Sequence, residues 1–144
     1  MSAANFAERA AHAEWQDAHG TLILSAARTS LEVTEQVAVH PNTRGNAAAR
    51  SLLSGVRACT VVWQGFFTRT QVPFALSALP RLSAGKRGAL IWGIVGNFSG
   101  APKRGYPMLI AEQQVSAPHG GGLLLRLTLH SDGAPLFGDD ALWD

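Results

Sequence analysis

The clearest hydrophobic pattern in the chain is a regular alternation close to its end. From position 123 to position 130 every odd position is a leucine, and the even positions from 126 onward are polar. Successive side chains of a β-strand point to opposite faces of a sheet, so this pattern predicts a strand that is buried on one face. We expect Leu123, Leu125, Leu127 and Leu129 to lie in the core, and Arg126, Thr128 and His130 to lie on the other face.

Further segments have the composition of strands. A Pro-His-Gly-Gly-Gly sequence joins the run 108–117 to the alternating strand, which predicts a β-hairpin. Segment 56–70 has apolar residues on both faces (Val62 and Phe66 against Val61), which indicates a strand covered on both sides by a second sheet, a helix or a partner. Other strands are expected at 21–24, 30–40 and 88–98.

Two of these strands contain residues that interrupt the pattern. Glu35 falls on the apolar face of 30–40, so either a bulge shifts the register or the carboxylate has a buried partner. Gly93 and Gly96 in 88–98 indicate a bend or a close approach of two backbones.

Helical signals are short. Asn5 and Glu8 fit a capping box, and Gly20 is a suitable end, so we expect an N-terminal helix over 5–19. Two prolines bound 74–80, which is expected to be a short helix or an irregular crossing. Segments 40–51 and 99–107 are expected to be polar loops or turns, and 132–144 a C-terminal tail. The prediction is a mainly β (α+β) chain, 1–144, forming one antiparallel β-sandwich or barrel with a flanking short helix.

The charge content is low and unevenly distributed. Only 15% of the residues are charged, which suggests that part of the surface is covered by another molecule. No acidic residue occurs between Glu35 and Glu112, an interval that carries nine basic residues. These basic residues can meet a phosphate backbone, meet the acidic ends of another copy, or form an ordinary solvated surface.

Motifs for catalysis or for cofactors are not apparent. The five histidines lack the spacing of zinc sites, and neither a nucleophile elbow nor a phosphate-binding loop is present. We therefore expect no enzyme, no metal and no cofactor. The single Cys59 suggests a reducing compartment, and neither a membrane span nor a secretory leader is expected. Arg57, Trp63 and Arg69 leave open an exposed strand face that binds single-stranded nucleic acid.

Four segments resemble, in the same order, parts of the major tail tube proteins of long-tailed bacteriophages. They are 31–39, 52–67, 91–98 and 112–137, and the hairpin followed by Ser-x-Gly is the most characteristic. The resemblance implies a virion structural protein of a phage or phage-like particle, assembled in the bacterial cytoplasm as stacked hexameric rings. In such a tube the rings surround a lumen for DNA, and the partners are other copies and other tail proteins.

The resemblance also implies roles for particular residues. The face with Arg126, Thr128 and His130 would point to the lumen or to a neighbour. Contacts between copies are expected from loop 40–51 and from the tail, and the residues concerned are Arg44, Arg50, Asp139, Asp140, Leu142 and Trp143. Lumens in this family tend to be acidic, whereas the centre of this chain is basic. A terminator or head–tail joining protein, and a small β-barrel that binds a ligand or single-stranded nucleic acid, remain alternatives.

Overall fold

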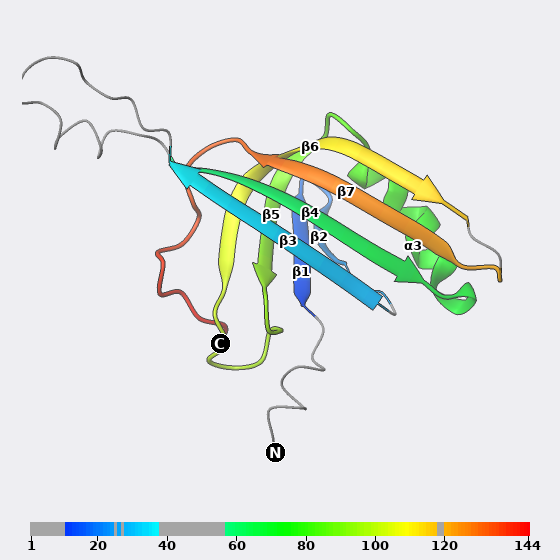
Figure 1. The fold of residues 1–144 in the computed structure, drawn as a ribbon, viewed down its shortest axis with the longest axis horizontal. Coiled ribbons are helices and arrows are strands. Elements are labelled where there is room, and N and C mark those ends of the chain that lie inside the picture. The colour runs from blue at the N-terminus through cyan, green and yellow to red at the C-terminus, as the bar shows by residue number, and fades with distance from the viewer. Residues whose placement is uncertain (1–10, 25, 27, 38–56, 118–119) are drawn as a thin grey trace, which may run out of the picture.

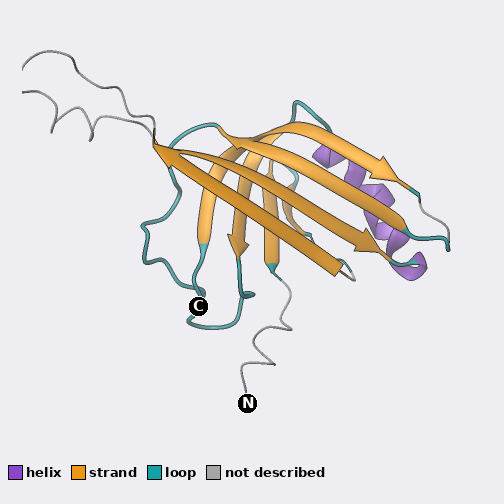
Figure 2. Ribbon diagram, viewed as in Figure 1, coloured by secondary structure: helices purple, strands orange, loops and turns teal. Residues whose placement is uncertain are grey.

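The fold is a single seven-stranded antiparallel sheet with a short helical segment beside it (Figures 1 and 2). The computed structural model describes residues 11–24, 26, 28–37, 57–117 and 120–144. The strand order in the sheet is β2-β1-β5-β6-β7-β4-β3. The strands are β1 (His12–Asp17), β2 (Gly20–Ile23), β3 (Arg28–Val37), β4 (Arg57–Phe67), β5 (Arg87–Gly93), β6 (Arg104–Ser116) and β7 (Leu123–Ser131).

The sheet folds over itself so that its two halves face each other. Strands β3, β4 and β7 run along one side of the molecule, and β5, β1 and β2 lie behind them at a steep angle (Figure 1). Strand β6 takes part in both halves, because its first part pairs with β5 and its second part pairs with β7. A register shift between Ile110 and Glu112 marks the change, as β-bulges do where a strand bends.

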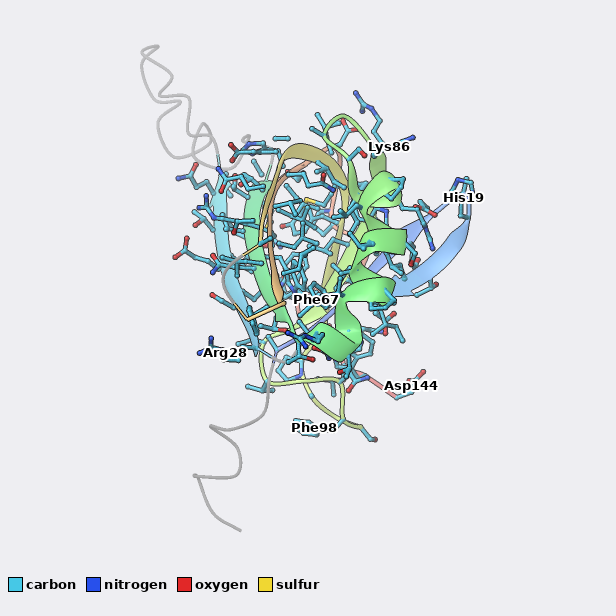
Figure 3. All side chains as sticks on the ribbon, turned by 90° about the vertical axis from the view of Figure 1, so that its right-hand side faces the viewer. His19, Arg28, Phe67, Lys86, Phe98 and Asp144 are labelled. Carbon is cyan, nitrogen blue, oxygen red and sulfur yellow. The ribbon has the colours of Figure 1, made fainter. Side chains whose placement is uncertain are left out.

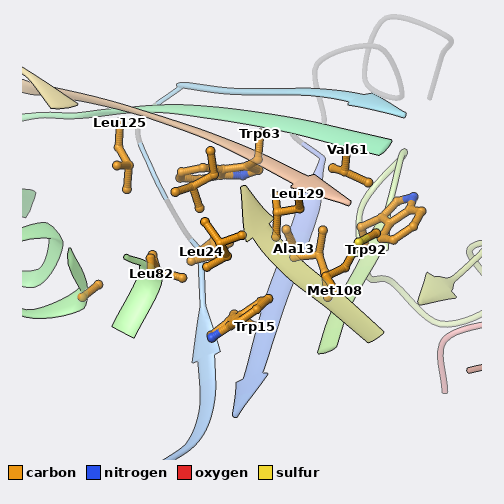
Figure 4. Packing of buried hydrophobic residues seen from close by; sticks show 14 of the residues in the cluster. Ala13, Trp15, Leu24, Val61, Trp63, Leu82, Trp92, Met108, Leu125 and Leu129 are labelled. Atoms are coloured by element: carbon orange, nitrogen blue, oxygen red, sulfur yellow. The ribbon is translucent and has the colours of Figure 1, made fainter. Parts of the chain in front are cut away.

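The core lies between the two halves and is built around large aromatic side chains (Figure 4). Trp15, Trp63 and Trp92 are each at most 1% exposed. Trp92 stacks on Tyr106 with 6.0 Å between the ring centroids. The leucines of β7 complete the core, because Leu123, Leu125, Leu127 and Leu129 are all buried as predicted, whereas His130 is exposed.

The segment between the prolines forms a helix. Helix α3 (Val72–Ala78) lies between two 3-10 turns, η2 (Arg69–Gln71) and η3 (Leu79–Leu82), and it begins at a proline, which suits the first helical turn. Its Ala75 and Ala78 are buried against the core. Gln113 of β6 donates hydrogen bonds to the carbonyl oxygens of Leu79 and Leu82, so the second part of β6 holds this helical segment in place.

The predicted N-terminal helix over 5–19 is wrong for the part that the structure describes. His12–Asp17 forms β1, which pairs with β5 on one side and with β2 on the other. Ala13 and Trp15 alternate into the core, so pairing and burial outweigh the helical preference of the alanines. Residues 1–10 lie outside the described part.

Two other expectations have different outcomes. The polar turn expected at 99–107 is wrong in its second half, because β6 begins at Arg104 and Tyr106 is fully buried. The loop expected at 40–51 lies outside the described residues. The strands expected at 21–24, 30–40, 56–70, 88–98 and 108–117 correspond to β2, β3, β4, β5 and β6.

Candidate functional site

A broad solvent-facing surface, called here the outer face, covers four strands. It is formed by the even-numbered residues of β3, β4 and β7 together with Leu109, Glu112, Gln114 and Ser116 of β6, because residues that pair across strands point to the same side. Arg126 stands between Gln64 and Gln114, and Thr128 stands between Val62 and Glu112. The structure therefore places Arg126, Thr128 and His130 on one common face, as the alternation predicted.

The outer face consists mainly of hydroxyl and amide side chains. Its third row contains Thr60 opposite His130, whose Nδ1 lies 3.2 Å from the threonine hydroxyl. Two carboxylates, Glu32 and Glu112, lie in the middle row, and the two arginines lie toward the end where β3 begins. The uncharged polar residues of this face are Ser30, Thr34, Gln36, Thr60, Gln64, Gln114, Ser116 and Thr128.

The C-terminal segment, residues 132–144, is docked on its own chain. Its end pairs with the segment after β5, because Lys103 N–H donates to Ala141 O at 3.0 Å and Trp143 N–H donates to Ala101 O at 2.9 Å. The Trp143 ring lies edge-on to His12, with 5.3 Å between centroids, and the Lys103 ammonium lies 5.4 Å from its centre. Leu142 remains 53% exposed.

A charged cluster fixes the same segment to the end of the sheet. Glu35 accepts a hydrogen bond from the buried Tyr106 hydroxyl and forms an ion pair with Arg104, while Arg57 pairs with Asp139 at 2.7 Å. Burial and then the Glu35 carboxylate raise the pKa of Tyr106 to about 12. The Arg57 guanidinium lowers the pKa of Asp139 and has its own pKa raised by that carboxylate.

The cluster explains why a carboxylate occurs on the apolar side of β3. The pairing of β3 with β4 runs without interruption from Arg28 to Val37, so no bulge is present there. Of the two explanations open from the sequence, the buried partner is therefore the correct one. The partner is Tyr106, the single tyrosine of the chain, and it was missed because its segment was read as a polar turn.

The acidic ends of the chain pair with its basic centre inside one copy. Arg81 binds Asp17 through two hydrogen bonds, at 2.8 and 3.2 Å, and this holds the pKa of Asp17 down to about 2. Arg87 pairs with Asp132. Four of the basic residues thus have intrachain carboxylate partners, and Arg44 and Arg50 lie outside the described part. These four are Arg57, Arg81, Arg87 and Arg104.

Other expected chemistry has little support in this geometry. Trp63 is fully buried, so the proposed nucleic-acid platform of Arg57, Trp63 and Arg69 is wrong. Cys59 is also buried, which raises the pKa of its thiol to about 11. Among the described residues, no three His, Cys, Asp or Glu side chains gather into a possible metal site. The helices described are too short or too polar to cross a membrane.

Comparison with solved structures identifies the class of fold. No protein-family model matches this sequence, and no curated protein matches it. A chain in the tail of an empty gene transfer agent particle, with C6 symmetry, superimposes with a TM-score of 0.53 at 16% identity. A chain in the virion of a native gene transfer agent particle gives 0.52 at 18%. Each alignment covers 88% of this chain and 95% of the solved chain.

The fold is therefore that of a subunit found in the tail of a phage-like particle. The resemblance to tail tube proteins that the sequence suggested is confirmed at the level of the fold. The alignment spans nearly the whole length of the solved subunits, so the similarity includes both halves of the sheet and not one common hairpin.

Proposed function

We propose that this chain is a structural protein of a phage-like tail, in which six copies form a ring and the rings stack into a tube that conducts DNA. The observation that carries the proposal is the fold match over 95% of a subunit from a tail that has C6 symmetry. A fold alone does not define a function, so the surfaces of this chain must also suit the role.

The outer face has the chemistry that a DNA conduit requires. Hydroxyl and amide groups offer weak contacts, and Glu32 and Glu112 repel phosphates across the middle of the face. The basic centre of the chain seemed to contradict a lumen that lets DNA slide. Its seven described members lie off this face, and four of them are paired with carboxylates. We therefore assign the face with Arg126, Thr128 and His130 to the lumen.

Contacts between copies are assigned to the C-terminal segment and to the loop 40–51. Leu142 and Ile94 are each 53% exposed, which is unusual for large apolar side chains unless another surface covers them. Asp140 has no partner among the described residues, whereas Asp139 and Trp143 already contact their own chain. Within the proposed interface we therefore expect Asp140 and Leu142 to contribute most, with Arg44 and Arg50 supplied by the loop.

Sedimentation velocity over a rising concentration series tests this function. The proposal predicts species much larger than the 15.2 kDa chain that grow with concentration. A single monomeric boundary at all concentrations and salts would contradict it. Assembly takes place in the bacterial cytoplasm in our proposal, together with other tail proteins, so the untagged chain is the right material.

A further inference from the structure

Two adjoining hollows form one trough on the outer face, at the end where β3 begins and β4 ends. Their volumes are about 600 and 510 Å³, and they share Gln64 and Leu124 in their linings. Arg28 lines the first hollow and Arg126 lines the second. The remaining lining is hydroxyl, amide and apolar, and it includes no carboxylate. The trough is therefore a surface for an anion.

A third arginine borders the trough at the turn before β7. A Cβ placed on Gly121 would lie 2.6 Å from Arg69 Nε, and one placed on Gly122 would lie 2.5 Å from the Phe66 ring. Arg69 and the trough residue Phe66 therefore both lie against this glycine turn. The Arg28 guanidinium lies 5.6 Å from the centre of the same Phe66 ring. The three arginines are thus gathered around one aromatic side chain.

These arginines differ from the basic residues described above. Arg57, Arg81, Arg87 and Arg104 all pair with carboxylates, whereas Arg28, Arg69 and Arg126 form no ion pair within the described part of the chain. Glu8 is the only acidic residue outside that part. Three guanidinium groups at one end of the outer face therefore remain available for an external anion, and their planar forks fit phosphate oxygens.

We infer that this trough binds the phosphate backbone of DNA through Arg28, Arg69 and Arg126. Gln64 and Gln114, which flank Arg126 in the sheet, can donate further hydrogen bonds to phosphate or sugar oxygens. The guanidinium of Arg28 covers the Phe66 ring, so that ring is not free to stack on a base, and the binding should not depend on sequence.

The inference rests on the proposed function, because the same face is assigned to the lumen. It adds that DNA is held weakly at one end of that face and repelled in the middle, where Glu32 and Glu112 lie. An acidic segment of a second copy is the other anion to consider. The C-terminal segment offers it only Asp140 and Asp144, and its backbone is already paired with residues 100–103. DNA is therefore the better match.

Fluorescence anisotropy with a labelled DNA duplex tests the inference on the full chain. Three phosphate contacts predict that affinity falls about 40-fold between about 50 mM and about 200 mM salt, and about 12-fold after one contact is lost. The test variant is Arg126→Gln. The matched control is Lys86→Gln, which removes the same charge at an exposed lysine far from Arg28 (Figure 3). Thermal melting confirms that both variants fold.

Weaker binding and a shallower salt dependence in Arg126→Gln, with Lys86→Gln like the parent chain, would support the inference. Equal losses in both variants, or none, would overturn it, since only net charge would then matter. Loss of self-association without loss of DNA binding in Arg126→Gln would also overturn it, because the trough would be a contact between copies. DNA binding is measured on dilute protein, so failure to form tubes contradicts the proposed function separately.

Discussion

Arg57 and Asp139 are 82 positions apart in the chain, and their guanidinium and carboxylate groups lie 2.7 Å from each other. Arg104 contacts the same carboxylate at 3.4 Å and also reaches Glu35. The C-terminal segment is thereby joined to the sheet of its own copy, and backbone hydrogen bonds to residues 100–103 continue the attachment. Much of the charge imbalance along the sequence is thus neutralised within one molecule.

The docking of the C-terminal segment depends on a glycine in β5. A Cβ on Gly93 would lie 2.2 Å from the Gly96 carbonyl oxygen and 2.6 Å from Trp143 Nε1. We expect Gly93→Ala to lower the free energy of unfolding by about 1–3 kcal/mol and to displace Trp143. Urea denaturation and Trp143 fluorescence measure the two effects. Gly138→Ala, whose Cβ would come no closer than 3.4 Å to another atom, is the control. A stable Gly93→Ala with unchanged fluorescence would contradict the described packing.

The pairing of Asp17 with Arg81 should make stability depend on pH. The pKa of Asp17 is lowered to about 2, so its contribution is complete above the ordinary value near 4 and is lost as the pH falls toward 2. We expect Asp17→Asn to cost about 2 kcal/mol near pH 7 and progressively less below pH 4. Urea denaturation at several pH values measures this difference.

The control for Asp17 is the exposed pair of Arg87 and Asp132, whose side chains are 65% and 46% exposed. Solvent screens such pairs, so Asp132→Asn should cost less than about 1 kcal/mol. A cost for Asp17→Asn that stays constant with pH would show that the charge of Asp17 is not the cause.

The two faces of β7 should respond oppositely to a negative charge. Leu127 is fully buried, and an aspartate there would place an unpaired charge in the core at a cost of several kcal/mol, enough to prevent folding. Thr128 is its neighbour on the outer face, and Thr128→Asp should fold. Circular dichroism melting compares the two variants. A Leu127→Asp protein that melts like the parent chain would refute the assignment of faces.

Assembly should be more sensitive at the C-terminal segment than on the helix. Leu142 and Leu76 are both 53% exposed, so they form a matched pair for surface substitution. We expect Leu142→Glu to reduce the sedimentation coefficient at high concentration, because it places a charge in the proposed interface, and Leu76→Glu to leave it unchanged. Equal behaviour of the two variants would remove Leu142 from the interface.

Most of the fold could be predicted from the sequence because strands have a period of two. In β7 each leucine of the alternation is buried, and the hairpin with β6 follows from the glycine-rich connection. β1 was missed because it offers only two buried alternating residues, Ala13 and Trp15, among alanines that favour a helix. Its strand conformation depends on β5, which is far away in the sequence, so local preference was a poor guide.

The candidate site was only partly predictable for a related reason. The alternation placed Arg126, Thr128 and His130 on one face, but nothing in it indicates that Arg28 and Arg69 lie near the same end. The charge pattern showed that acidic and basic segments are complementary. It did not show that Asp139 meets Arg57 of its own chain, since the same complementarity also fits two copies. Contacts between distant segments decide such questions, and one sequence does not encode them in a local pattern.

The central claim is that copies of this chain form stacked six-fold rings. Negative-stain electron microscopy of the purified protein at rising concentration, with rotational analysis of end-on particles, tests it most directly. The account predicts rings with six-fold symmetry and a central hole, and tubes of stacked rings at the highest concentrations. Monomers alone throughout the series, or closed assemblies without a central hole, would contradict it.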